Sequence, residues 1–94
     1  MNPKITHDPE HQRFETEVEG HRAVLEYRRQ DAIADLLHVR VPSPIGGRGI
    51  AGQLTRTALE HAREAGWKVI PTCPYVRAWI DRHPDYADLV VGEA

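Results

Sequence analysis

The sequence predicts a single small domain of mixed α/β structure, of the α+β type, with helices packed on one sheet. Three observations predict it. Residues near the start alternate between polar and apolar, which is typical of antiparallel strands with one exposed face. A longer apolar run then leads into a glycine-rich loop, after which apolar residues recur at helical spacing. A short apolar run after that helix predicts a strand parallel to the one before the loop.

Alternation predicts the first two strands. Residues 13–19 place apolar side chains on one side and glutamates on the other, and residues 21–28 alternate again. Gly20 lies between them and supplies the positive φ that a tight hairpin turn needs. Residues 1–12 show no period, which predicts a flexible N-terminal segment ahead of a domain spanning residues 13–94.

A strand and a helix are predicted on either side of the loop. Residues 32–41 are apolar on both faces, which predicts a central strand covered on two sides. From Ile50 the apolar residues fall at steps of four, and Gly66 is well placed to end this helix. Residues 67–71 form the short apolar run that predicts the parallel strand.

The C-terminal part predicts a second helix and a last strand. Pro74 suits the first turn of a helix that covers residues 75–82. Pro84 ends that helix, because proline cannot continue it. Residues 85–91 are then predicted as an edge strand.

Composition and charge narrow the class of protein. A net charge of −2 without any basic block argues against a nucleic-acid partner. The single cysteine excludes an intrachain disulfide, nothing resembles a signal peptide, and no apolar run approaches the roughly 20 residues of a membrane span. The six histidines are scattered without metal-ligand spacing, so no metal site is predicted. We predict a cytoplasmic protein without a membrane partner, as a monomer or weak homodimer.

The loop itself predicts a phosphate-binding site. Four glycines (Gly46, Gly47, Gly49 and Gly52) lie within seven positions between the strand and the helix. A helix that begins after such a loop presents unpaired N–H groups at the positive end of its dipole. Glycines leave room for an anion to approach these groups.

The residues alone leave the phosphate ligand open. Residues 47–52 match the dinucleotide pattern G-x-G-x-x-G, but the acidic residue expected after the next strand is missing beyond Ile70. The chain is also too short for a doubly wound sheet. A P-loop is excluded because no Gly-Lys-Ser/Thr follows. A structural glycine loop that binds nothing stays open as well.

Three segments around the loop carry a resemblance to a known family: Val39–Pro42, Gly46–Ala51 and Leu54. Together they resemble motif A of the GNAT superfamily of N-acetyltransferases. In that motif a strand ends beside a [Q/R]-x-x-G-x-[G/A] loop that holds the coenzyme A pyrophosphate. Gly46 stands where Gln or Arg is usual, which removes a side-chain donor and leaves the backbone amides.

Further segments narrow the resemblance. Residues 35–42, 58–63, 66–75 and 82–86 are together similar to the short single-domain N-acetyltransferase-like family. That family carries a C-P-[F/Y] segment, here Cys73-Pro74-Tyr75. The resemblance implies a minimal GNAT-like fold: a mixed, mostly antiparallel sheet with a parallel, splayed strand pair and two helices.

The resemblance also implies acetyl-CoA as the cofactor and an amine as the acceptor. The pantetheine arm would lie between the splayed strands, the pyrophosphate on the loop, and Cys73 near the thioester. The implied coenzyme contacts are Val39, Val41, Gly46, Gly47, Arg48, Gly49, Ile50, Ala51, Gly52, Cys73 and Tyr75.

Cys73 and His38 are the candidates for chemistry. Cys73 lies between a strand end and a helix-starting proline, where the helix N-terminus favours a thiolate. It could act as an acetyl carrier or as a general acid to the departing thiolate, or be a small buried apolar residue. His38 could serve as a base or be a satisfied histidine of the cleft.

Two functions from different classes follow. The first is an acetyl-CoA-dependent N-acetyltransferase that acts on a small molecule or on a protein lysine or N-terminus, directly or through Cys73. The second is a non-catalytic acyl-CoA-binding or protein-interaction module with the same fold. The second is supported because the sequence places no obvious carboxylate base in the cleft and the chain is short for a deep acceptor pocket.

Overall fold

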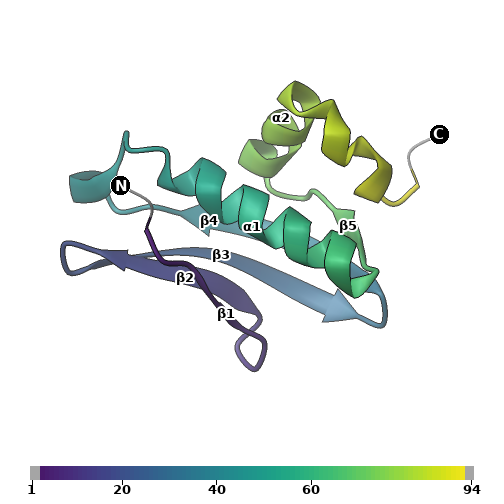
Figure 1. Cartoon of the computed structure of the whole chain (residues 1–94), viewed down its shortest axis with the longest axis horizontal. Helices are drawn as coiled ribbons and strands as arrows, with labels where there is room; N and C mark the ends of the chain where they lie inside the picture. The colour runs from purple at the N-terminus through teal and green to yellow at the C-terminus, as the bar shows by residue number, and fades with distance from the viewer. Residues whose placement is uncertain (1–2, 93–94) are drawn as a thin grey trace.

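The sheet has five strands in the order β1-β2-β3-β4-β5, so neighbours in the chain are also neighbours in the sheet. A computed structural model describes residues 3–92 of the chain. The strands are β1 (Thr6–Asp8), β2 (Arg13–Val18), β3 (His21–Gln30), β4 (Ile33–Arg40) and β5 (Lys68–Ile70). The helices are α1 (Ile50–Ala65), α2 (Pro74–Arg82) and the 3₁₀ helices η1 (Ser43–Ile45) and η2 (Pro84–Leu89). Figure 1 shows the sheet with α1 across it, which confirms the predicted α+β fold class.

The hairpin of β2 and β3 forms where the alternation predicts it. Antiparallel pairing covers the whole of β2. Glu19 and Gly20 both have positive φ (52° and 79°), as the tight two-residue turn requires. β3 continues to Gln30, past its predicted end at Arg28, and the chain then turns at Asp31, whose φ is 55°.

β1 is a strand that the sequence did not predict. It pairs antiparallel with β2, and the His7 ring stacks on Phe14 with 4.2 Å between centroids. His7 Nε2 also forms a 2.5 Å hydrogen bond with the Tyr27 hydroxyl. The prediction of a flexible segment over residues 1–12 is therefore wrong for β1, because three residues carry no period of their own. Residues 1 and 2 lie outside the described residues.

α1 is the predicted helix and supplies a large share of the core. Gly49 begins it and Gly66 ends it, both with positive φ (78° and 79°). The N–H groups of Gly66 and Trp67 close the C-terminal end on the carbonyls of Arg63 and Ala62. No helix among residues 3–92 is long and apolar enough to cross a membrane. The buried face of α1 consists of Ile50, Leu54, Thr55, Ala58, Leu59 and Ala62.

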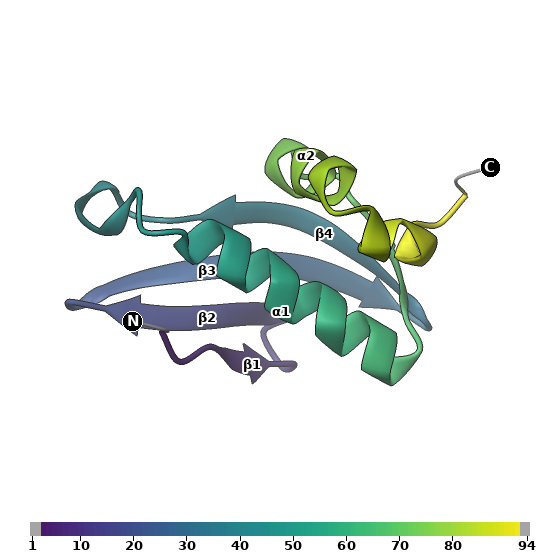
Figure 2. The ribbon, with the colours of Figure 1, turned by 45° about the horizontal axis from the view of Figure 1, so that its top comes forward.

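The helices leave one face of the sheet open. On the inner face, Ala34 and Leu36 of β4 and Val69 of β5 are almost fully buried. On the outer face, Ile33 and Ile70 remain 39% and 40% exposed. Figure 2 shows α1 lying along the sheet with α2 to one side of it. β4 is central in the strand order, but the prediction that it is covered on two sides is wrong, since no helix packs on Ile33 or Ile70.

The C-terminal segment forms η2 instead of the predicted edge strand. Only Val90 forms an isolated parallel bridge, with Val69. Tyr86 and Leu89 are both buried, and their spacing of three suits a helical turn. In a strand the same two side chains would point to opposite faces, one of them into solvent. The strand prediction for residues 85–91 is therefore wrong.

We expect the free energy of unfolding to decrease as the pH falls below about 6.5, because of His7. Burial first, and then the neighbouring His61, lower the pKa of His7, against a smaller opposing effect of Asp8. The unfolded chain then binds more protons than the folded chain between the ordinary histidine pKa and the lowered one. The stability that neutral His7 contributes is thus present above about pH 6.5 and is lost as the pH falls through the folded pKa. An NMR titration of the His7 ring and urea unfolding at several pH values measure the two effects.

His7→Phe is the control for this prediction. Phenylalanine preserves a ring to stack on Phe14 and removes the titrating group, so this variant should lose less stability in acid than the wild type. A His7 midpoint at or above about 6.5, or an unchanged pH dependence in His7→Phe, would contradict it.

Candidate functional site

The loop between β4 and α1 depends on two glycines with positive φ. The chain first forms η1, whose fully buried Ile45 anchors the loop to the core. Gly47 and Gly49 then adopt φ values of 76° and 78°, a region that residues with a side chain rarely occupy. These two glycines therefore determine how the chain enters α1.

The start of α1 presents backbone N–H groups ahead of the helical hydrogen-bond ladder. Gln53 donates to the Gly49 carbonyl at 3.1 Å, so the N–H groups of residues 50–52 precede the first such bond. No side chain caps this end, and the first turn contains no acidic residue. A Cβ atom at Gly47 or Gly49 would meet nothing within 4 Å. Free donors at the positive end of the helix dipole, in open space, suit an anion.

The side chain of Arg48 points to the β2–β3 hairpin. Its guanidinium donates to both carboxylate oxygens of Glu19, at 2.8 and 3.1 Å. This hydrogen bonding lowers the pKa of Glu19 and raises that of Arg48. The pair is exposed and adds little to stability, but it holds Arg48 on a protein carboxylate.

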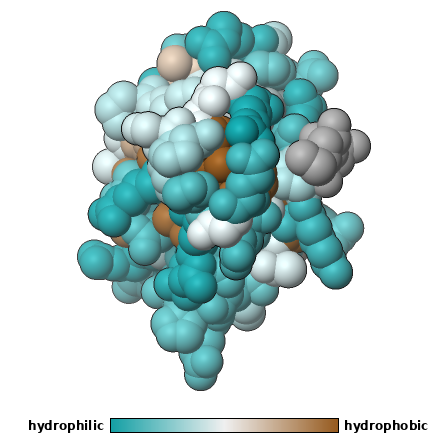
Figure 3. Space-filling view, turned by 90° about the vertical axis from the view of Figure 1, so that its left-hand side faces the viewer, coloured by the Kyte–Doolittle hydropathy of each residue, from teal (hydrophilic) through white to brown (hydrophobic). Residues whose placement is uncertain are grey.

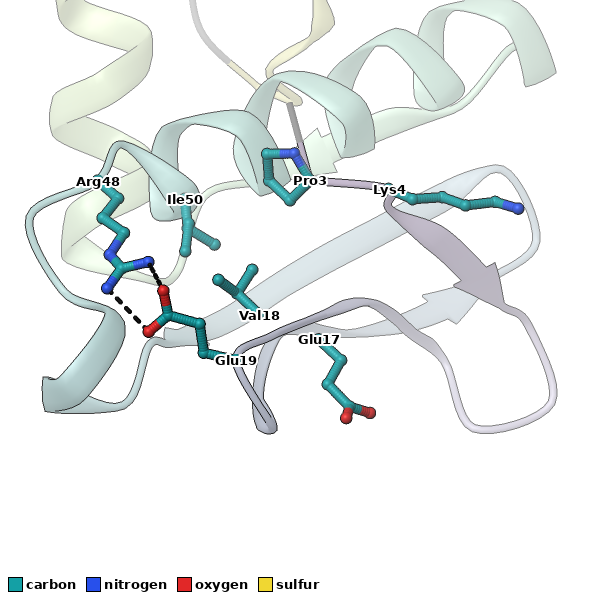
Figure 4. Close-up of a pocket in the computed structure, with 7 residues that line it drawn as sticks. All are labelled: Pro3, Lys4, Glu17, Val18, Glu19, Arg48 and Ile50. Atoms are coloured by element: carbon teal, nitrogen blue, oxygen red, sulfur yellow. Dashed lines mark hydrogen bonds and ion pairs between the residues drawn. The ribbon is translucent and has the colours of Figure 1, made fainter. Parts of the chain in front are cut away.

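A cavity of about 410 Å³ adjoins this ion pair on the hairpin side of the loop. Figure 4 shows Val18 and Ile50 as its apolar wall, with the Arg48–Glu19 pair at one end and Lys4 pointing away from that pair. Figure 3 views this end of the molecule, where the surface is mostly hydrophilic and apolar atoms are visible in small patches between hydrophilic side chains. Its lining comes from the residues before β1, from the end of β2 with Glu19, and from Arg48 and Ile50, and it includes no residue of α2.

β4 and β5 separate after a short parallel ladder. The last of its three pairs is Asp35↔Ile70. Beyond it, the Thr72 hydroxyl donates to the Asp35 carboxylate, and the Cys73 N–H donates to the Leu36 carbonyl at 3.0 Å. α2 then begins, while β4 continues to its end paired only with β3. We call the place where the strands separate, from Asp35 and Leu36 to Cys73, the fork.

A β-bulge lies in β4 just beyond the fork. Leu37 stands between two successive cross-strand pairs and has no partner of its own on β3. In a regular strand, alternate residues direct their backbone N–H and C=O groups to the same neighbouring strand. An extra residue shifts this alternation by one position. The Leu36 carbonyl faces β5, so beyond the bulge the backbone of Val39 faces the open side of the fork. Val41 follows the end of β4 and is half-buried.

Cys73 and Tyr75 lie at the start of α2, close to the start of α1. Cys73 is the N-cap of α2, is 5% exposed and has a free thiol. A Cβ atom at Gly52 would lie 3.4 Å from the Tyr75 hydroxyl and 3.4 Å from the Trp79 indole nitrogen. The first turns of the two helices therefore meet on one side of the fork.

His38 lies on the outer face of the sheet, next to Glu26. His38 Nε2 and Glu26 Oε1 form a hydrogen bond, and an Arg40 guanidinium nitrogen lies 3.4 Å from the same Nε2. The two side chains are 41% and 34% exposed. Glu26 is a carboxylate that the sequence analysis missed. Alternation puts it on the outer face of β3, but only the pairing of β3 with β4 identifies His38 as its neighbour.

The predicted residues fall into three places. Residues 46–49 form the end of the loop, with Arg48 turned to the hairpin, and residues 50–52 form the first turn of α1. Val39, Cys73 and Tyr75 lie around the fork, and His38 is on the outer face. Within residues 3–92, no three His, Cys, Asp or Glu side chains are arranged to hold a metal ion.

Comparisons with known proteins agree with this geometry. The profile of the GCN5-related N-acetyl-transferase family matches residues 13–89. Protein NATD1 of Mus musculus is 34% identical over 84 residues, covering 86% of this chain and 76% of its own. Protein NATD1 of Danio rerio is 30% identical over 94 residues, covering 94% and 84%.

A solved structure shares the whole architecture. The solution structure of a GCN5-like protein from Staphylococcus aureus superposes with a TM-score of 0.76 at 25% identity, covering 99% of this chain and 92% of its own. A glycine loop at the start of α1, a fork between parallel strands and the profile match all indicate one conclusion. The chain belongs to the family of GCN5-related N-acetyltransferases.

Proposed function

We propose that this protein binds acetyl-CoA and transfers its acetyl group to an amine. The observation that carries the proposal is the start of α1: uncapped N–H groups, without an acidic residue, beside the fork of β4 and β5. Family membership supports the choice of coenzyme A among phosphate ligands.

The site suits two polar parts of this coenzyme, the pyrophosphate and the amides of the pantetheine arm. The N–H groups of residues 47–52 would hold the pyrophosphate, since open space surrounds Gly47 and Gly49. The backbone of Val39 and Val41 would pair with the amides of the pantetheine arm, because β4 has no strand partner there on the side of β5. Cys73 and Tyr75 would line the thioester end.

When bound, acetyl-CoA supplies an acetyl thioester. The amine nitrogen forms an amide bond with the acetyl carbon and loses a proton. The carbon–sulfur bond breaks, and the sulfur leaves as a thiol. His38 is the candidate for accepting the amine proton. If its Nε2–H donates to Glu26, this hydrogen bond orients the ring and leaves Nδ1 free to accept that proton. Cys73 would carry the acetyl group or donate a proton to the departing sulfur.

A dinucleotide is the weaker candidate ligand. The residues after β5 are Pro71 and Thr72, so this strand does not end on the acidic residue that would bind a ribose. The antiparallel first half of the sheet also differs from the doubly wound fold.

We predict that acetyl-CoA raises the melting temperature and that NAD does not. A ligand at about 100 times its Kd stabilises the native state by about 2.7 kcal/mol. For a domain of this size that corresponds to a shift of roughly 10–20 °C. Thermal unfolding with each ligand measures it. Stabilisation by NAD alone would overturn the coenzyme assignment.

Ala51→Glu should weaken acetyl-CoA binding by about tenfold or more while leaving the protein folded. Ala51 lies in the first turn of α1, where an added carboxylate repels a phosphate but favours the helix dipole. Calorimetry measures the affinity and thermal unfolding tests the fold. Ala51→Gln is the matched control of nearly equal size, and equal affinities of the two variants would contradict a phosphate site on this loop.

Glu26→Gln should lower kcat/KM for amine acetylation by about 100-fold without changing acetyl-CoA affinity. A neutral amide accepts a weaker hydrogen bond from the His38 ring than a carboxylate does, so the ring is held less firmly in the orientation that leaves Nδ1 open. A steady-state assay measures kcat/KM, and calorimetry measures the affinity for acetyl-CoA.

Glu17→Gln is the matched control for this variant. Glu17 is an exposed glutamate of the neighbouring β2, and its replacement should leave kcat/KM unchanged. A Glu26→Gln enzyme with wild-type kcat/KM would remove this pair from the mechanism. Tight acetyl-CoA binding by the wild type without turnover of any amine would favour the non-catalytic acyl-CoA-binding module.

A further inference from the structure

The outer face of the sheet has a cavity of about 490 Å³ next to the fork. Two of its wall residues, Ile33 and Ile70, are 39% and 40% exposed, which is unusual for large apolar side chains in this protein. With Tyr75 they are the exposed large hydrophobic residues among residues 3–92. The cavity is lined by Arg28, Gln30, Asp31, Ala32, Ile33, Asp35 and Ile70.

The cavity ends where the two parallel strands separate. Asp35 and Ile70 form the last pair of the ladder, and the Cys73 N–H bonds to the carbonyl of Leu36, the next residue of β4. It opens on the face that the helices leave uncovered, which is also the face that carries Glu26 and His38. A molecule in it would thus reach the fork from the side opposite to α1.

The charge of the cavity favours a cation next to Asp35. The Thr72 hydroxyl donates to Asp35 Oδ1 and holds this carboxylate at the mouth of the fork. Arg28 is paired in register with Asp35, yet no ion pair joins Asp35 to any Lys or Arg among the described residues. Asp31 adds a second carboxylate to the wall. The two carboxylates in the wall of the cavity outnumber its one guanidinium, that of Arg28. Ile33 and Ile70 provide the apolar surface of the cavity.

We propose that the acceptor is a primary alkylamine that binds in this outer-face cavity. Its apolar chain lies against Ile33 and Ile70, and its ammonium group binds the Asp35 carboxylate. This assignment rests on the proposed function, because it names the class of acceptor for the same fork. The ammonium would be at the mouth of the fork, on the face from which His38 can accept its proton.

An NMR titration of the labelled protein with hexylamine, and separately with 1-hexanol, tests the proposal without any need for turnover. Hexylamine should shift the backbone amide signals of the cavity residues and bind roughly two- to fivefold more tightly than the alcohol, as an exposed charge pair allows. Asp35→Asn should remove this preference, since asparagine can still accept from Thr72 but lacks the charge. Ile70→Ser should weaken both ligands, because it removes apolar contact.

Two controls sharpen the result. Glu17→Gln, which also removes one negative charge but lies outside the cavity, should preserve the preference for the amine. Hexanoate tests whether the Arg28 guanidinium, rather than the Asp35 carboxylate, selects the charge of the ligand. Binding of hexanoate more tightly than hexylamine would overturn the proposal. So would amine-induced shifts confined to other parts of the protein, or an Asp35→Asn variant with the same preference as the wild type.

Coenzyme titration in the same sample separates this proposal from the proposed function. Acetyl-CoA is followed by the amide signals of residues 47–52, and amines by those of the cavity. Failure of acetyl-CoA to bind overturns the proposed function, whereas failure of hexylamine to bind overturns only the acceptor site. The ammonium group could belong to a lysine of a protein or to a free alkylamine, and a parallel titration with Nα-acetyl-lysine amide compares the two. Binding tighter than that of hexylamine indicates a protein lysine, and weaker binding indicates a free amine.

Discussion

The separation of β4 from β5 is the constraint on which the rest of the site depends. Their parallel ladder has only three pairs, and Pro74 then starts a helix in place of a longer strand. One more hydrogen bond, from Cys73 to Leu36, keeps the departing chain beside β4. Because backbone groups need partners, the edge of β4 beyond this point is available for another chain of amides. The fork therefore exists because the strand pairing stops early.

Two further features act on the same place. The β-bulge at Leu37 changes which residues direct their backbone groups into the fork. The two glycines with positive φ bring the first turn of α1 next to that of α2, where Gly52 lies close to Tyr75. Two helix N-termini then act on one region, and both favour negative charge. The proposed ligand, a thioester that carries phosphates, suits such a region.

The small size of the chain decides how the faces of the sheet are used. With 94 residues in all, and two α-helices within residues 3–92, the protein buries the inner face in one core and leaves the outer face exposed. The outer face carries charged cross-strand neighbours such as Glu26 and His38, with the exposed Ile33 and Ile70 near the fork. An open face of this kind would give the proposed acceptor access without a deep pocket.

The sequence by itself determined the local elements and the loop. The periods of residues 13–19 and of the segment that starts at Ile50 were sufficient for a strand and a helix, since both patterns depend on neighbours close in the chain. Gly20 and Gly66 were sufficient for a turn and a helix end, because their positive φ is a local requirement. The glycines before α1 likewise identified the loop, because φ preferences act on single residues.

Only the tertiary structure decided β1, η2, the open face of β4 and the pair of Glu26 with His38. β1 is held by the stacking of His7 on Phe14, and η2 by burial of Tyr86, and neither contact has a trace in the local pattern. Apolar residues on both faces of β4 did not reveal that helices cover only one of them. The pairing of Glu26 with His38 depends on the register of two strands, and the bulge at Leu37 shifts that register by one residue. These features come from contacts between residues far apart in the chain, whose free energy no local periodicity encodes.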